Sequence, residues 1–113
     1  MSAVILKARL RADLKAAMQA RATDDVRLLR TLIAALDNAE AVAEPPKTFG
    51  SRAFGDPSGE VARREIDGPA LEHLLAAEIE ARLSAAADYR RHGQVAEADR
   101  LRREAELIAR YRA

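Results

Sequence analysis

The segment from Leu28 to Glu40 constrains the fold most strongly, because it is the most concentrated apolar stretch of the chain. Its leucines and its isoleucine recur every three or four residues, which is the spacing of one face of an α-helix. Three polar residues, Arg30, Asn38 and Glu40, stand among them. The segment therefore predicts a core helix that carries polar groups close to its buried face.

The composition favours helices along the whole chain. Hydrophobic residues make up 49% of the 113 residues, but they are mainly Ala and Leu, and aromatic residues reach only 4%. These residues and the 33% of charged residues are good helix formers, whereas strand formers are scarce. We expect an all-α fold in a single domain spanning residues 1–113, a length sufficient to bury a core without disulfide bonds.

Several kinds of site and location are disfavoured by the sequence. The chain has no Cys, which excludes disulfide bonds and thiolate sites. His73 and His92 stand at opposite ends of one predicted helix, too far apart to share a metal ion. No apolar run approaches the roughly 18 residues of a membrane-spanning helix, and no signal-peptide core is present. We expect a cytoplasmic protein without cofactor, metal or membrane partner, and no small-molecule substrate is evident.

Periodicity predicts four helices. The first spans about residues 3–22, and the second runs from Thr23 or Asp24 as N-cap to about residue 43. Asp67 as N-cap and Pro69 in the first turn begin the third helix, which ends near residue 91 at His92-Gly93. The fourth begins near Gln94. Short connections predict two antiparallel hairpins, with the fourth helix a truncated connector.

Each predicted helix has an apolar stripe that we expect to be buried. The stripes are Leu6, Leu10, Leu14, Ala17 and Met18 on the first helix; Val26, Leu29, Ile33 and Leu36 on the second, widened by Leu28 and Leu32; Leu71, Leu75, Ile79, Leu83 and Ala86 on the third, with Leu74 alongside; and Val95, Ala98, Leu101, Ala105 and Ile108 on the fourth.

A loop rich in proline and glycine, at about residues 44–66, separates the two hairpins. Residues 44–59 hold three of the four prolines and three of the five glycines, and Pro45 and Pro46 end the second helix. A loop of this length in a small domain is typical of either a functional or a disordered segment. Phe49 and Phe54 lie in it, either docked on the core or free to bind a partner.

Charge is unevenly distributed although the net charge is only +1. Residues 1–22 carry five basic residues and one acidic residue, whereas residues 23–44 carry two basic and five acidic residues. Lys7, Arg11 and Lys15 follow one edge of the first helix at i, i+4 and i+8, and we name them the basic edge. The simpler interpretation is a helix pair of complementary charge; a phosphate-binding surface is the alternative.

Polar residues also lie beside the apolar stripes, and partly buried charges require partners. We expect them to form an interhelical network that fixes the register of the helices, with a surface facing a ligand or RNA as the alternative. The residues of this predicted network are Arg30, Asn38, Glu40, Glu78, Arg82 and Glu104.

Five segments in order resemble the GatB/YqeY family, which comprises small YqeY-like proteins and the tail of the B subunit of the tRNA-dependent amidotransferase. The segments lie within residues 5–43 and 64–111, and the loop between them is an insertion. They are Leu10-Arg-Ala-Asp-Leu-Lys-Ala-Ala-Met18, Leu29-Arg-Thr-Leu-Ile-Ala-Ala-Leu-Asp-Asn-Ala-Glu40, Glu78-Ile-Glu-Ala-Arg82, Ala87-Asp-Tyr-Arg-Arg-His-Gly93 and Glu104-Ala-Glu-Leu-Ile-Ala-Arg-Tyr111.

The resemblance implies an all-helical N-terminal region, and we expect the smaller C-terminal helical domain of the family to be missing. It implies an accessory module that contacts tRNA or a translation partner. The family label, carbon–nitrogen ligase with glutamine as amido donor, belongs to the amidotransferase complex, and nothing in these residues supports that chemistry. The alternative is a protein-interaction or structural module, with the seam of the fourth helix covered by a partner. The residues expected to meet RNA phosphates are Lys7, Arg11, Lys15, Arg100 and Arg103.

Overall fold

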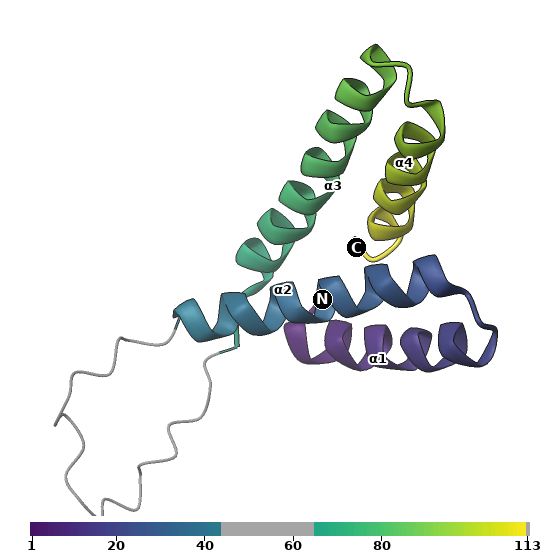
Figure 1. The fold of residues 1–113 in the computed structure, drawn as a ribbon. Coiled ribbons are helices and arrows are strands. Elements are labelled where there is room, and N and C mark those ends of the chain that lie inside the picture. Colours follow the sequence, from purple (N-terminus) through teal and green to yellow (C-terminus); the bar gives the residue numbers. More distant parts are fainter. Residues whose placement is uncertain (44–64, 113) are drawn as a thin grey trace, which may run out of the picture. The chain divides into compact units, whose positions relative to one another are not determined.

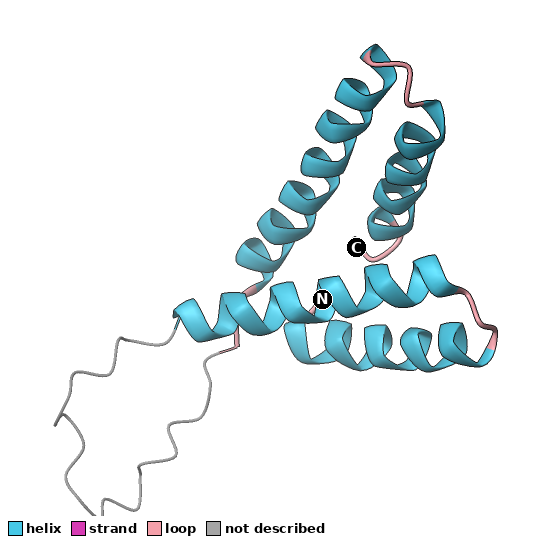
Figure 2. Cartoon of the chain, viewed as in Figure 1, coloured by secondary structure: helices cyan, strands magenta, loops and turns pink. Residues whose placement is uncertain are grey.

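The computed structural model describes residues 1–43 and 65–112, and within them every regular element is a helix (Figures 1 and 2). The helices are α1 (Ala3–Gln19), α2 (Thr23–Ala43), α3 (Gly68–Arg91) and α4 (Val95–Ala109). The pairs α1·α2 and α3·α4 pack against each other, which confirms the predicted all-α fold of two hairpins. Phe49 and Phe54 lie outside the described residues. None of the described helices is both long and apolar enough to cross a membrane.

The chain divides into two compact units, Met1–Ala8 with Asp67–Ala113, and Arg9–Ile66. Each unit has its own buried apolar residues. In the first unit they are Ala3, Leu6, Leu71, Leu75, Ala86, Ala98, Ala105, Ile108 and Tyr111; in the second they are Leu10, Ala17, Leu28, Leu29, Leu32 and Leu36.

Four residues spaced by four along α2 form its main buried line. These are Leu28, Leu32, Leu36 and Glu40, so that a carboxylate continues a row of leucines. Leu29 is buried beside them, whereas Val26 and Ile33 of the predicted stripe are only half-buried. The sequence pattern placed the helix correctly, but its buried face is centred on Leu28, Leu32 and Leu36, with Val26 and Ile33 at the edge.

The connection between α1 and α2 is a tight helix C-cap. Arg21 takes the left-handed conformation with φ 56°. The N–H of Ala22 donates to the carbonyl of Ala17 at 2.9 Å, and that of Arg21 to the carbonyl of Met18 at 3.1 Å. This pair of hydrogen bonds, which we name the paired C-cap, satisfies carbonyls that the helix end leaves open. The turn therefore ends α1 at Gln19, three residues before the predicted boundary.

Helix α2 begins differently from the prediction. The N–H of Val26 donates to the carbonyl of Ala22 at 2.9 Å, which makes Ala22 the N-cap position and places Thr23 and Asp24 inside the first turn. The acidic residues Asp24 and Asp25 still lie at the positive end of the helix dipole, where a carboxylate is favourable.

Both ends of α3 confirm the prediction. The Asp67 carboxylate accepts a hydrogen bond from the Ala70 N–H at 2.8 Å, and Pro69 stands in the first turn. At the other end His92 is the C-cap residue, and Gly93 follows with φ 77°. This left-handed conformation is strained for a residue with a side chain, which explains a glycine at this position.

Three predicted core residues are exposed: Met18, Leu83 and Val95. On α3 the buried residues are Leu71, Leu75 and Ala86, and the Arg82 side chain between them, only 13% exposed, is largely shielded in place of its neighbour Leu83. Met18 lies next to the paired C-cap at the end of α1, and Val95 is the first residue of α4. Helix ends have fewer neighbours than helix centres, so their apolar residues remain in contact with water.

Candidate functional site

The α3·α4 hairpin carries the side-chain groups with the most defined geometry. Two guanidinium groups and three carboxylates lie together along it, and we name this set the Arg82 cluster. Its members are Glu78, Arg82, Glu97, Arg100 and Glu104.

Arg82 links the two helices. Its Nε donates to Glu104 Oε1 at 3.1 Å, and its Nη1 donates to the backbone carbonyl of Glu78 at 3.0 Å. The Glu78 carboxylate lies 3.6 Å from the same Nη1. The Arg82 and Glu104 side chains are only 13% and 14% exposed, so this ion pair is largely removed from water. A partly buried pair of this kind fixes register, because removing one partner leaves the other charge uncompensated.

Arg100 completes the cluster from within α4. It donates from Nη2 to Glu97 Oε2 at 2.8 Å and from Nη1 to Glu104 Oε2. The hydrogen bond to Glu97, together with the negative charges of Glu104 and Glu97, raises the pKa of Arg100 above its ordinary value. Arg100 therefore stays charged throughout the accessible pH range, and its cation is engaged by two carboxylates of its own helix.

The predicted polar network is formed in part. The structure brings Glu78, Arg82 and Glu104 together on the α3·α4 hairpin. On α2, Glu40 is buried, whereas Arg30 and Asn38 are exposed. We expected Arg30 to be partly buried because it follows Leu29, but it turns away from the buried line of Leu28, Leu32 and Leu36.

The residues expected to meet RNA phosphates differ in their surroundings. Arg11 and Lys15 are exposed one helical turn apart on α1, and Lys7 is half-buried. Arg103 is exposed on α4. Arg100, by contrast, is ion-paired within the Arg82 cluster. The structure therefore leaves Arg11 and Lys15 as the most accessible part of the basic edge.

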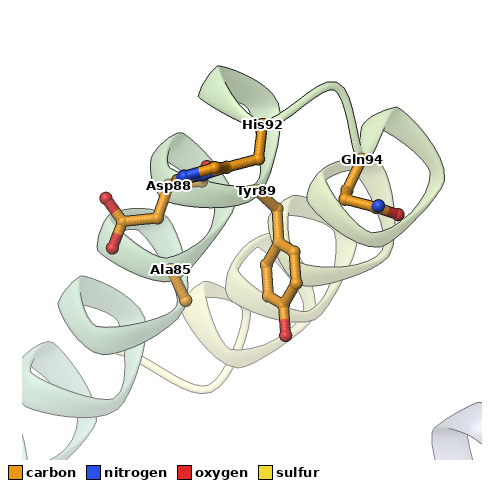
Figure 3. A pocket seen from close by; sticks show the side chains of 5 residues that line it. All are labelled: Ala85, Asp88, Tyr89, His92 and Gln94. Carbon is orange, nitrogen blue, oxygen red and sulfur yellow. The ribbon is translucent and has the colours of Figure 1, made fainter.

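A hollow of about 360 Å³ lies at the end of the α3·α4 hairpin, lined by Ala85, Asp88, Tyr89, His92 and Gln94. We name it the tip pocket. Figure 3 shows the Tyr89 ring standing between Asp88 on one side and Gln94, at the start of α4, on the other. Sequence reasoning did not select these residues. An aromatic residue in the polar last turn of a helix, at the end of its apolar stripe, is the signal that could have identified them.

A second hollow of about 280 Å³ has a different chemistry, and we name it the cationic groove. Apolar side chains and two guanidinium groups line it: Leu83, Ala86, Ala87, Arg90 and Arg102. Arg90 comes from the last turn of α3 and Arg102 from α4, so the cationic groove spans both helices of the hairpin.

Groups of three or more metal-ligating His, Asp or Glu side chains are absent from residues 1–43 and 65–112. His73 and His92 are both exposed, and His92 Nδ1 lies 2.8 Å from the carbonyl oxygen of Asp88. Comparisons of this chain with models of protein families, with curated proteins and with solved structures found no match.

Proposed function

We propose that this protein is a YqeY-like accessory module that contacts tRNA, similar in role to the tail of the amidotransferase B subunit. The proposal assigns no reaction to the chain itself and places it in the cytoplasm. The observation that carries it is the exposure of Arg11 and Lys15, one turn apart on a helix rich in positive charge. Two cations at this spacing can each neutralise a phosphate along a nucleic-acid strand.

Two further features support the proposal. The all-helical hairpins agree with the architecture that the resemblance implies. Arg82 and Glu104, which come from two separate segments of the resemblance, are paired across the hairpin. The alternative of a protein-interaction module rested on an uncovered seam along α4, but Ala98, Ala105 and Ile108 are buried. We therefore do not propose a partner at that seam.

Fluorescence anisotropy of labelled tRNA at two salt concentrations tests the proposal. We expect binding at about 50 mM salt that weakens steeply towards about 200 mM, because released counterions drive phosphate binding. The variant Arg11→Gln/Lys15→Gln should bind less tightly and show a salt dependence reduced by about two phosphate contacts.

The matched control is Arg27→Gln/Arg30→Gln, which removes two exposed positive charges from α2 instead. It has the same net charge as the α1 variant, so it should bind tRNA nearly as well as the native protein. Absence of binding at the lower salt concentration would contradict the proposal. Equal weakening of both variants would show that only the overall charge matters.

A further inference from the structure

The tip pocket combines an accessible aromatic ring with groups that form hydrogen bonds. Tyr89 is 42% exposed although it is one of only four aromatic residues in the chain. The same hollow is lined by Asp88, His92 and Gln94, whose side chains carry a carboxylate, an imidazole and an amide. Its volume is within the usual range of small-ligand sites. A flat ligand with polar edges suits such a site.

The C-cap of α3 holds the tip pocket in place. The Gln94 N–H donates to the Tyr89 carbonyl at 2.8 Å, and the Gly93 N–H donates to the Arg90 carbonyl at 3.1 Å. These two bonds tie the start of α4 to the turn that carries Tyr89. Asp88 is likewise ion-paired with Arg91 on the same helix. The backbone that carries the pocket residues is therefore fixed before any ligand binds, which lowers the entropic cost of binding.

We propose that the tip pocket binds an unpaired nucleobase of RNA, stacked on the Tyr89 ring, with its edge hydrogen-bonded by Asp88 and Gln94. Every nucleobase offers a flat face that stacks on an aromatic side chain. The Asp88 carboxylate accepts from a base N–H, and the Gln94 amide both donates and accepts. Arg91, in the last turn of α3, is ion-paired with Asp88, one of the residues that line the pocket.

This inference rests on the proposed function and extends it, because it names the part of the RNA that is bound. Bases within a duplex are stacked on both faces and their Watson–Crick edges are paired. The tip pocket therefore selects loops, bulges or ends, where a base is free to leave the stack. The basic edge on α1 recognises only phosphate, so the two contacts can be tested separately.

Tyrosine fluorescence reports on the tip pocket directly, since the chain has no Trp and only two Tyr residues. The other, Tyr111, is buried. In a Tyr111→Phe background all emission comes from Tyr89. We expect a short single-stranded RNA to quench this emission strongly, and a blunt-ended duplex of the same sequence to quench it little. A nucleoside monophosphate forms the third arm and tests whether a free nucleotide is the ligand.

Anisotropy of the labelled single strand measures the contribution of the ring. Tyr89→Ala should weaken binding roughly tenfold, because a stack on an aromatic side chain is lost. Tyr89→Phe keeps the ring and should bind within about a factor of two of the native protein. Leu83→Ala is the matched control, since Leu83 is also 42% exposed on α3 but lines the cationic groove. Circular dichroism verifies that each variant is folded.

Unchanged binding by folded Tyr89→Ala, or quenching by the duplex equal to that by the single strand, would overturn the inference. Quenching by the monophosphate without quenching by the single strand would overturn RNA as the source of the base. These failures differ from failure of the proposed function. If tRNA binding depends on Arg11 and Lys15 but not on Tyr89, the proposed function stands and only the tip pocket assignment falls.

Discussion

The two hairpins are closed by the same turn but differ in the residue that closes it. In each case a left-handed residue follows the first helix, and two backbone N–H groups return to carbonyls of its last turn. That residue is Gly93 between α3 and α4, but Arg21 between α1 and α2. Because a side chain makes the left-handed conformation unfavourable, the α1·α2 turn is formed at a cost that the α3·α4 turn does not have.

The buried interiors of the two hairpins also differ. The buried residues of Arg9–Ile66 are mainly leucines, with Leu28, Leu32 and Leu36 in one row. The α3·α4 hairpin buries Leu71, Leu75, Ile108 and Tyr111 together with three alanines, and it adds the largely shielded pair of Arg82 and Glu104. Apolar burial is strong but non-directional, whereas an ion pair with fixed hydrogen bonds specifies one alignment. The comparison teaches that one hairpin combines a strained turn with a row of leucines, while the other combines a relaxed turn with an apolar interior to which an ion pair between the helices adds a fixed alignment.

Removing a leucine from the α2 row should have the largest effect. Leu32 is almost completely buried, so Leu32→Ala is expected to lower the free energy of unfolding by about 3 kcal/mol through lost burial and the cavity left behind. Urea denaturation followed by circular dichroism measures the change. Met18→Ala is the control at an exposed apolar site and should change stability by less than about 0.5 kcal/mol. If Leu32→Ala and Met18→Ala lost similar amounts of unfolding free energy, burial would not explain the contribution of Leu32.

Breaking the Arg82–Glu104 pair should have the next largest effect. Glu104→Leu leaves the Arg82 cation partly buried beside an apolar group, and we expect a loss of about 2 kcal/mol. The double variant Arg82→Met/Glu104→Leu should recover part of that loss, since the shielded Arg82 cation is removed with its partner, while Arg100 keeps Glu97. A double-mutant cycle from urea denaturation gives the coupling energy.

The pair formed by Arg112 and Glu72 is the internal control for this cycle. It also joins the start of α3 to the residues that follow α4, but its side chains are 42% and 46% exposed. Glu72→Gln should therefore cost less than about 1 kcal/mol. A loss for Glu72→Gln as large as that for Glu104→Leu would show that shielding from water does not set the strength of these pairs.

The sequence predicted the elements well because caps and periodicity are local. Asp67, Pro69 and Gly93 mark the ends of α3 by their own conformational preferences. The buried face was harder to predict, because Arg82 and Leu83 are neighbours and only packing against α4 decides which one is covered. Hydropathy favours Leu83, but the structure largely shields Arg82 from water, and Glu104 provides its partner.

The candidate site was less predictable than the fold, because it too depends on how the helices pack against each other. Glu78, Arg82 and Glu104 were identified from their places beside the apolar stripes, and they do lie together. The pairing of Arg100 with Glu97 and Glu104 follows helical spacing, yet the sequence also allowed Arg100 to face a phosphate. The tip pocket depends on how the C-cap brings Gln94 beside Tyr89, and that arrangement is a property of three-dimensional packing.

Substitutions at Gly93 and Arg21 test whether the two turns differ in backbone strain. Gly93→Ala should lower the free energy of unfolding by about 1 kcal/mol, because alanine is strained at a φ of 77°. No atom lies within 4 Å of the position its Cβ would take, so the cost comes from the backbone alone. Arg21→Gly should act in the opposite direction and raise stability by about 0.5 kcal/mol. Thermal unfolding measures both, and changes of the same sign would contradict the comparison of the two turns.

The smallest expected effect concerns Arg100, whose side chain is 31% exposed and whose pairs therefore contribute only about 0.5 kcal/mol. Because its pKa is raised on folding, its contribution is fully present below the pKa of the unfolded chain and is lost only as the pH rises through the still higher folded value. The stability difference between the native protein and Arg100→Met should thus stay constant from neutral pH to about pH 11. In Arg100→Lys the ammonium titrates near pH 10.4, so the advantage of that variant over Arg100→Met should fall towards pH 11. Urea denaturation of the three proteins across this pH range measures these differences. If the stability difference between the native protein and Arg100→Met fell towards pH 11 as steeply as that between Arg100→Lys and Arg100→Met, the raised pKa of Arg100 would be contradicted.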